Sequence, residues 1–248
     1  MGKRGSTFKR GNVEENVEEK VLMVQSKGER LKRAMVRSGV GLMPFIPLPA
    51  NWYRRVLVAD SERRYTDGRW AYMNGPAESH RYSIIAGCCD YYVSNDRTIL
   101  DVGCGEGILQ RRLRYTNYIG VDMNPQAITL ARSSENENTK FVLAEAERFQ
   151  PDAAYDVIIF NESLYYIPNP IGVFNRYRAF LKQAGIMIVC MFQTNLARKL
   201  WKELQRAEMR ELTAVKISNE LGFASIIKVF GNPFTSQVCD EARPSSKI

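Results

Sequence analysis

The sequence predicts a doubly wound α/β fold, with a mostly parallel sheet, helices on both faces and an antiparallel C-terminal hairpin strand. Three observations predict it. From residue 98 onward, short apolar runs alternate with amphipathic segments, as in parallel sheets with crossover helices. The first run ends in a glycine-rich turn, where open sheets of this class bind ligands. The last two runs are separated by only a few residues, which favours a hairpin.

The elements follow in order. Strands are predicted over Thr98–Val102, Tyr118–Asp122, Lys140–Ala144, Tyr155–Asn161, Gly185–Phe192, Leu212–Ser218 and Ala224–Phe230. Helices are predicted over Ile108–Tyr115, Asn124–Ser133, Asn169–Lys182 and Leu196–Glu208. Two of them begin with Asn-Pro, an N-cap residue followed by a proline that suits the first helical turn.

Length and composition favour one well-buried domain with an extension. The 248 residues contain no apolar stretch of the roughly 18 residues that a membrane span needs. Residues 1–6 lead into Glu-rich sequence without an apolar core, so no secretory signal is predicted and a cytoplasmic protein is expected. Five cysteines without metal-ligand spacing and a single histidine predict reduced thiols and no metal site.

The positive charge is concentrated at the start of the chain. Residues 1–69 hold 15 Lys and Arg against 8 Asp and Glu, out of a net charge of +8. An amphipathic helix is predicted over 14–37, followed by a proline-broken segment at 39–49. This basic N-terminal region, which we call the basic arm, either forms a solvated charged helix or makes peripheral contact with an anionic surface such as a membrane. We expect an extension at 1–65, one domain at 66–232 and a tail at 233–248.

The first predicted strand runs into a turn with alternate glycines at Gly103, Gly105 and Gly107. Glycines let the backbone turn tightly and approach a ligand closely. The spacing differs from the G-x-G-x-x-G of nicotinamide and flavin sites, because Ile108 stands where the last glycine would be. Asp101 precedes the glycines, and an acid there suits a cationic amino-acid ligand better than a pyrophosphate.

Two further acids end the next strands. Asp122 ends the second strand, where a carboxylate can accept hydrogen bonds from both hydroxyls of an adenosine ribose, or simply cap the strand. Glu145 follows the third strand, and Glu147 is the alternative candidate for the same role. There Glu145 can accept a hydrogen bond from an adenine amino group, or remain an exposed loop residue.

These segments resemble the Rossmann-like class I S-adenosylmethionine (AdoMet)-dependent methyltransferase family, of the small-molecule or saccharide type. The resemblance covers residues 98–192 and rests on four motifs in order: Leu-Asp-Val-Gly-Cys-Gly-Glu-Gly, Gly-Val-Asp-Met-Asn-Pro-Gln-Ala-Ile, Ala-Glu-Ala-Glu and Tyr-Asp-Val-Ile-Ile-Phe-Asn-Glu-Ser-Leu-Tyr-Tyr-Ile. The antiparallel seventh strand of the family's sheet suits the terminal hairpin.

The resemblance implies AdoMet as cofactor, S-adenosylhomocysteine as product, and a set of cofactor contacts. Asp101 and the glycine turn with Cys104 would lie near the methionine moiety. Asp122 and Met123 would lie at the ribose and adenine, and Glu145 with Ala146 at the adenine edge. Asn161, at the end of the fourth strand, completes the expected set. The family usually has Asp where this chain has Glu145.

The segments Thr66–Met73 and Glu78–Tyr82 resemble the pre-domain region of the same family, in which an N-terminal helix closes over the cofactor. Residues 66–95 are therefore expected to form a helical lid. By analogy, Arg81 would pair with the methionine carboxylate. Trp70 and Tyr72 would either line the pocket or pack in the core.

Methyl transfer to a hydroxyl is an in-line displacement that needs alignment and a route for the proton. His80 is the candidate base, although a lone histidine is often structural. Glu162 is the alternative base. Tyr165 follows the same strand, at a position where this fold places groups that face the acceptor.

The acceptor is expected to be a small molecule or a saccharide-type compound such as a glycolipid, methylated on oxygen. The sequence lacks the Asn/Asp-Pro-Pro-aromatic loop of enzymes that methylate amino groups in DNA, and it lacks a recognisable nucleic-acid-binding module. A nucleic-acid acceptor is therefore disfavoured. The alternatives are N-methylation, an RNA or protein acceptor, and a non-catalytic scaffold with the same fold. A nicotinamide-dependent dehydrogenase is disfavoured by the glycine spacing.

Overall fold

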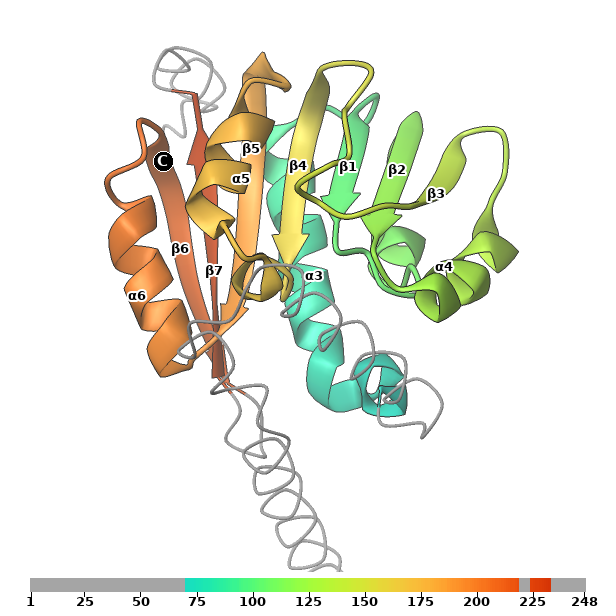
Figure 1. The fold of residues 1–248 in the computed structure, drawn as a ribbon, viewed down its shortest axis with the longest axis horizontal. Helices are drawn as coiled ribbons and strands as arrows, with labels where there is room; N and C mark the ends of the chain where they lie inside the picture. Colours follow the sequence, from blue (N-terminus) through green and yellow to red (C-terminus); the bar gives the residue numbers. More distant parts are fainter. Residues whose placement is uncertain (1–69, 219–223, 233–248) are drawn as a thin grey trace, which may run out of the picture. The chain divides into compact units, whose positions relative to one another are not determined.

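The computed structural model describes residues 70–218 and 224–232 (Figure 1). The predicted basic arm, the helix over 14–37, the proline-broken segment and the C-terminal tail lie outside these residues. The lid prediction falls partly outside them as well.

The described chain forms a seven-stranded sheet in the order β3-β2-β1-β4-β5-β7-β6. The strands are β1 Thr98–Val102, β2 Asn117–Asp122, β3 Thr139–Leu143, β4 Tyr155–Asn161, β5 Leu181–Phe192, β6 Arg210–Ser218 and β7 Ala224–Gly231. Strands β1 to β5 are parallel, whereas β7 is antiparallel to both β5 and β6. The predicted fold class is confirmed, with one refinement. The antiparallel strand lies inside the sheet, between β5 and β6, and β6 forms the edge.

The helices and 3₁₀ turns (η) connect these strands. They are η2 Ala71–Asn74, α3 Pro76–Tyr92, η3 Gln110–Arg112, α4 Pro125–Ala131, η4 Arg132–Ser134, η5 Leu164–Tyr166, α5 Pro170–Arg178 and α6 Asn195–Leu204. Both predicted Asn-Pro helix starts are confirmed. The Asn124 side chain accepts bonds from two backbone N–H groups of the first turn of α4, each 2.9 Å long, and the Asn169 side chain accepts one at the start of α5.

Two hydrophobic layers cover the two faces of the sheet. Phe174 of α5 and Trp201 of α6 belong to one layer. Tyr82 and Ile85 of α3, with Ile128 of α4, belong to the other. Figure 1 shows α5 and α6 in front of the sheet, with α3 behind it. Because α3 buries these side chains against the sheet, it forms part of the core of the domain.

The predicted helix over Ile108–Tyr115 was wrong, because only the single turn η3 forms there. After the glycine turn the chain must return along the length of β1 to the start of β2, a distance of about 16 Å for a five-residue strand. The nine residues 108–116 would span only about 13 Å as a continuous helix. The segment instead passes through a turn and η3 and continues without regular structure from Leu113, and it buries Leu109 and Gln110.

Two other helices end earlier than expected. Helix α5 stops at Arg178 because β5 already begins at Leu181, where Phe180 O accepts a 2.8 Å hydrogen bond from Tyr155 N. Helix α6 ends at Leu204, four residues before the predicted end. Among the described residues, no helix is long and apolar enough to cross a bilayer.

Candidate active site

The site lies at the carboxyl ends of β1, β2 and β4. In the strand order, the chain runs outward from β1 to β3 and then returns to β4 on the other side of β1. Such a reversal leaves a crevice at the carboxyl ends of the central strands, where open α/β sheets bind ligands. The glycine turn and the segment after β4 therefore meet at this point.

The three glycines all have left-handed backbone conformations. The φ angles of Gly103, Gly105 and Gly107 are +81°, +56° and +76°. At Gly103 there is also no room for a side chain, because a Cβ would lie 2.2 Å from the Cβ of Ser163. Ser163, which follows β4, also donates a hydrogen bond to the carbonyl of Val102. The turn is therefore fixed against the end of β4.

Asp122 holds the same turn from the side of β2. Its carboxylate accepts hydrogen bonds from the backbone N–H groups of Gly105 and Asn124, each 2.9 Å long. Burial raises the pKa of Asp122, and these backbone bonds oppose the rise. Two oxygens with about four lone-pair positions can accept further donors beyond these two.

Asp101 lies beneath the turn and is 1% exposed. Its Oδ2 accepts a 2.8 Å bond from the Tyr118 hydroxyl, whereas its Oδ1 has no hydrogen-bond partner within the described ranges. Burial raises the pKa of Asp101 to about 7, although the Tyr118 bond opposes the rise. An unsatisfied buried acceptor costs about 1–3 kcal/mol. A bound cation would remove that cost.

Four more predicted cofactor residues lie in the turn or follow β2 and β3. Cys104 is buried in it, and burial raises the pKa of its thiol. Met123 is half-buried and follows Asp122. Glu145, after β3, forms a 3.1 Å ion pair with Arg148. The carbonyl of Ala146 accepts a 2.9 Å bond from the Tyr177 hydroxyl.

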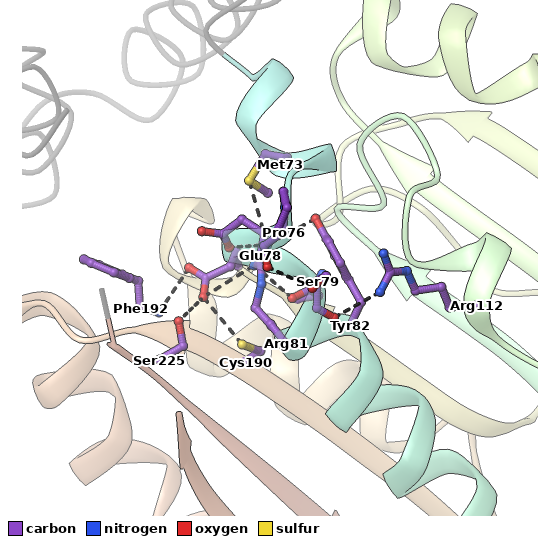
Figure 2. A network of polar contacts seen from close by, with 12 residues as sticks. Met73, Pro76, Glu78, Ser79, Arg81, Tyr82, Arg112, Cys190, Phe192 and Ser225 are labelled. Carbon is purple, nitrogen blue, oxygen red and sulfur yellow. Dashed lines mark hydrogen bonds and ion pairs between the residues drawn. The ribbon is translucent and has the colours of Figure 1, made fainter. Parts of the chain in front are cut away.

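Arg81 of α3 lies at the centre of a second polar cluster (Figure 2). It is 1% exposed and pairs with Glu78 at 3.1 Å and Glu162 at 3.6 Å. It also donates a 3.2 Å bond to Asn161 Oδ1. Burial acts to lower the pKa of Arg81, but the surrounding acidic groups, Glu162 first among them and Glu78 included, together more than offset this and the pKa is raised.

Glu162 has a φ of +57°, the one positive value among the described non-glycine residues. Such a conformation costs about 1–3 kcal/mol and persists only where the surroundings fix it. Five donors contact the carboxylate, from Arg81, Tyr165, Cys190, Phe192 and Ser225.

The structure therefore brings the predicted residues together in two groups. The glycine turn and Asp122 form one, and Arg81, Asn161, Glu162 and Tyr165 form the other. Half-buried His80 precedes Arg81 in α3, but no hydrogen bond or ion pair joins its side chain to another residue of the described ranges. Trp70 lies just before η2, whereas the side chain of Tyr72 is not described.

Several partners of these residues were missed from the sequence. Glu78 lay within a recognised motif but had no assigned role. Ser163, Cys190 and Ser225 carried no local signal, because their roles depend on contacts with residues distant in the chain. Within the part of the chain that the structure describes, no group of three His, Cys, Asp or Glu residues could hold a metal ion.

Comparison with known proteins identifies the family. A family described as a methyltransferase domain matches residues 94–227, just over half of the chain. A trans-aconitate 2-methyltransferase of Escherichia coli is 30% identical over 124 residues, covering 48% of this chain and 46% of that protein. A malonyl-acyl-carrier-protein O-methyltransferase of Ilyobacter polytropus is 29% identical over 100 residues, covering 38% of this chain and 39% of that protein. The chain thus spans less than half the length of these relatives.

A solved structure shows the same fold. It is the 1,6-didemethyltoxoflavin-N1-methyltransferase of Burkholderia thailandensis with bound 1,6-didemethyltoxoflavin and S-adenosylhomocysteine. It aligns with a TM-score of 0.61 and 19% identity over 75% of this chain and 91% of that chain. This chain therefore belongs to the methyltransferase domain family and has the fold of the class I S-adenosylmethionine-dependent methyltransferases.

Proposed function

We propose that this protein is an AdoMet-dependent methyltransferase that transfers a methyl group to a small-molecule acceptor, most simply to an oxygen atom. The observation that carries the proposal is the glycine turn, with its three left-handed glycines, held by Asp122 at the reversal point of the sheet. Membership of the methyltransferase domain family supports the same activity.

The residues around the turn fit the two ends of AdoMet. Asp101 offers a buried, unpartnered carboxylate oxygen to the cofactor's ammonium group. The carboxylate of Asp122 has lone pairs left to accept hydrogen bonds from the ribose hydroxyls, in addition to those from the Gly105 and Asn124 backbone N–H groups. Met123, Glu145 and Ala146 would border the adenine. Bound AdoMet supplies an electrophilic methyl group on its sulfonium sulfur.

The protein's own contribution is to align the acceptor and to take up its proton. His80 is our proposed base, because it is the residue before Arg81 in α3 and its half-buried side chain forms no hydrogen bond or ion pair with the described residues. Tyr165 would shape the acceptor pocket. The relatives, a trans-aconitate 2-methyltransferase and a malonyl-acyl-carrier-protein O-methyltransferase, support acceptors other than nucleic acid. A saccharide or glycolipid acceptor remains our specific proposal.

The division of the chain into parts is also a proposal. Residues 1–65 would form a basic extension and 233–248 a tail of a cytoplasmic protein, while the segment 66–95, which includes α3, would act as a lid over the cofactor. The extension's excess of Lys and Arg would allow peripheral contact with an anionic membrane surface.

Turnover with methyl-labelled AdoMet tests the activity. Sugars, glycolipid precursors and small carboxylic acids would be incubated with the protein, and label transfer would be measured against a heat-denatured control. Saturable transfer to one acceptor class is expected. Cofactor binding without transfer to small molecules, nucleic acids or proteins would instead indicate a non-catalytic role.

A further inference from the structure

The crowding of Glu162 bears on its role. A carboxylate offers about four lone-pair positions to donors. Oε1 is contacted by Ser225 Oγ at 3.2 Å, Cys190 Sγ at 3.5 Å and Arg81 at 3.6 Å. Oε2 accepts from Phe192 N at 3.0 Å and from the Tyr165 hydroxyl. The oxygens are therefore saturated by protein donors, which leaves no free lone pair for an acceptor's proton.

These five donors come from four different places in the fold. Arg81 lies on α3, Tyr165 on η5, and Ser225 on β7, while Cys190 and Phe192 lie on β5. The backbone N–H of Glu162 also donates a 2.9 Å bond to Cys190 O. Glu162 therefore fixes the start of α3 to the carboxyl ends of β4 and β5 and to the neighbouring start of β7.

The same part of α3 also contacts the cofactor side. Asn74, just before α3, donates a hydrogen bond to Glu106 in the glycine turn. Arg112 of η3 donates a 3.0 Å bond to the carbonyl of Ser79. The guanidinium carbons of Arg81 and Arg112 lie 4.8 Å and 5.4 Å from the centroid of the Tyr82 ring. A continuous chain of contacts therefore runs from the glycine turn through α3 to Glu162.

We propose that Glu162 is a positioning residue rather than the general base, an inference that rests on the proposed function. Its ion pair with Arg81 holds α3 against the glycine turn and thereby couples the cofactor side of the crevice to the acceptor side. Arg81 already contacts Glu78, Asn161 and Glu162. It therefore affects cofactor binding indirectly, by positioning α3.

A second arginine pair on α3 provides a matched control. Asp90, near the other end of the helix, pairs with Arg97, which is completely buried at the amino end of β1. Both Glu162→Gln and Asp90→Asn remove one carboxylate partner from a buried guanidinium, so both should lower the Tm. Only Glu162→Gln acts at the end of α3 that contacts the glycine turn.

The test is calorimetric titration of the full chain with S-adenosylhomocysteine, at a temperature where all variants are folded. Glu162→Gln should weaken binding roughly fivefold or more, as expected for coupled sites. Asp90→Asn should change it less than about twofold, as expected for a distant site. If Glu162→Gln folds poorly, Arg81→Lys, which keeps the charge but not the planar fork, should weaken binding in the same way.

Wild-type affinity in Glu162→Gln, or equal weakening in Asp90→Asn, would overturn the coupling. With an acceptor in hand, Glu162→Gln should retain turnover within about tenfold and keep the wild-type pH profile. A loss of about 10²–10⁴-fold, together with loss of the acidic limb of the profile, would make Glu162 the base. Failure of the wild-type protein to bind S-adenosylhomocysteine would instead refute the proposed function, and this would be seen before any variant is compared.

Discussion

Replacing Gly103 by alanine tests the geometry of the glycine turn most sharply. The new Cβ would lie 2.2 Å from Ser163 Cβ, and because both atoms are fixed to the backbone, the ends of β1 and β4 must separate. Overpacking of this kind costs about 1–3 kcal/mol. The φ of +81° adds about 1–2 kcal/mol for any residue with a Cβ. We therefore expect a loss of about 2–5 kcal/mol of unfolding free energy.

The assay is thermal and urea unfolding of Gly103→Ala beside Gly87→Ala. At about 2–4 °C per kcal/mol for a chain of this size, Gly103→Ala should lower Tm by roughly 4–20 °C. Gly87 lies in α3, and a Cβ there meets nothing within 4 Å, so its replacement should stabilise the helix by up to about 1 kcal/mol. If Gly103→Ala were as stable as wild type, the described packing of the turn against Ser163 would be wrong.

Three further substitutions test individual roles. Asp122→Ala should weaken S-adenosylhomocysteine binding by about 1–3 kcal/mol, because the ribose hydroxyls lose their acceptor; calorimetry showing unchanged affinity would refute the ribose assignment. Burial raises the pKa of Asp101 to about 7, so its protonated form stabilises the fold at low pH, and this contribution is lost as pH rises from about 4 to 7. In urea unfolding at several pH values, Asp101→Asn should flatten that dependence, and an unaltered slope would contradict the shift. His80→Ala should leave cofactor binding intact and slow turnover about 10²–10⁴-fold if the imidazole is the base; wild-type turnover would leave His80 a structural role.

Features determined by neighbouring residues were predictable from the sequence. The helix starts at Asn124 and Asn169 depend on a side chain bonding to backbone N–H groups two or three residues later. The helix predicted over Ile108–Tyr115 does not form, because the connecting segment must span the distance from the end of β1 to the start of β2. Local periodicity carries no information about that distance. The position of β7 inside the sheet is likewise a matter of long-range pairing.

The candidate site divides in the same way. The glycine turn and Asp122 end successive predicted strands, and the resemblance to the family implied that both lie at the cofactor. The pairing of Arg81 with Glu162 joins residues 81 positions apart, and the bond from Ser225 to Glu162 spans 63. Only the folded sheet shows that the two residues assigned to separate tasks, cofactor binding and proton transfer, are each other's ion-pair partners.

Isothermal titration of the purified full chain with S-adenosylhomocysteine tests the central claim most directly. Because the turn and Asp122 are already in place, we expect binding at a micromolar Kd or tighter, and weaker binding by Asp122→Ala. No detectable binding by a folded wild-type sample would contradict the account of this crevice as a cofactor site.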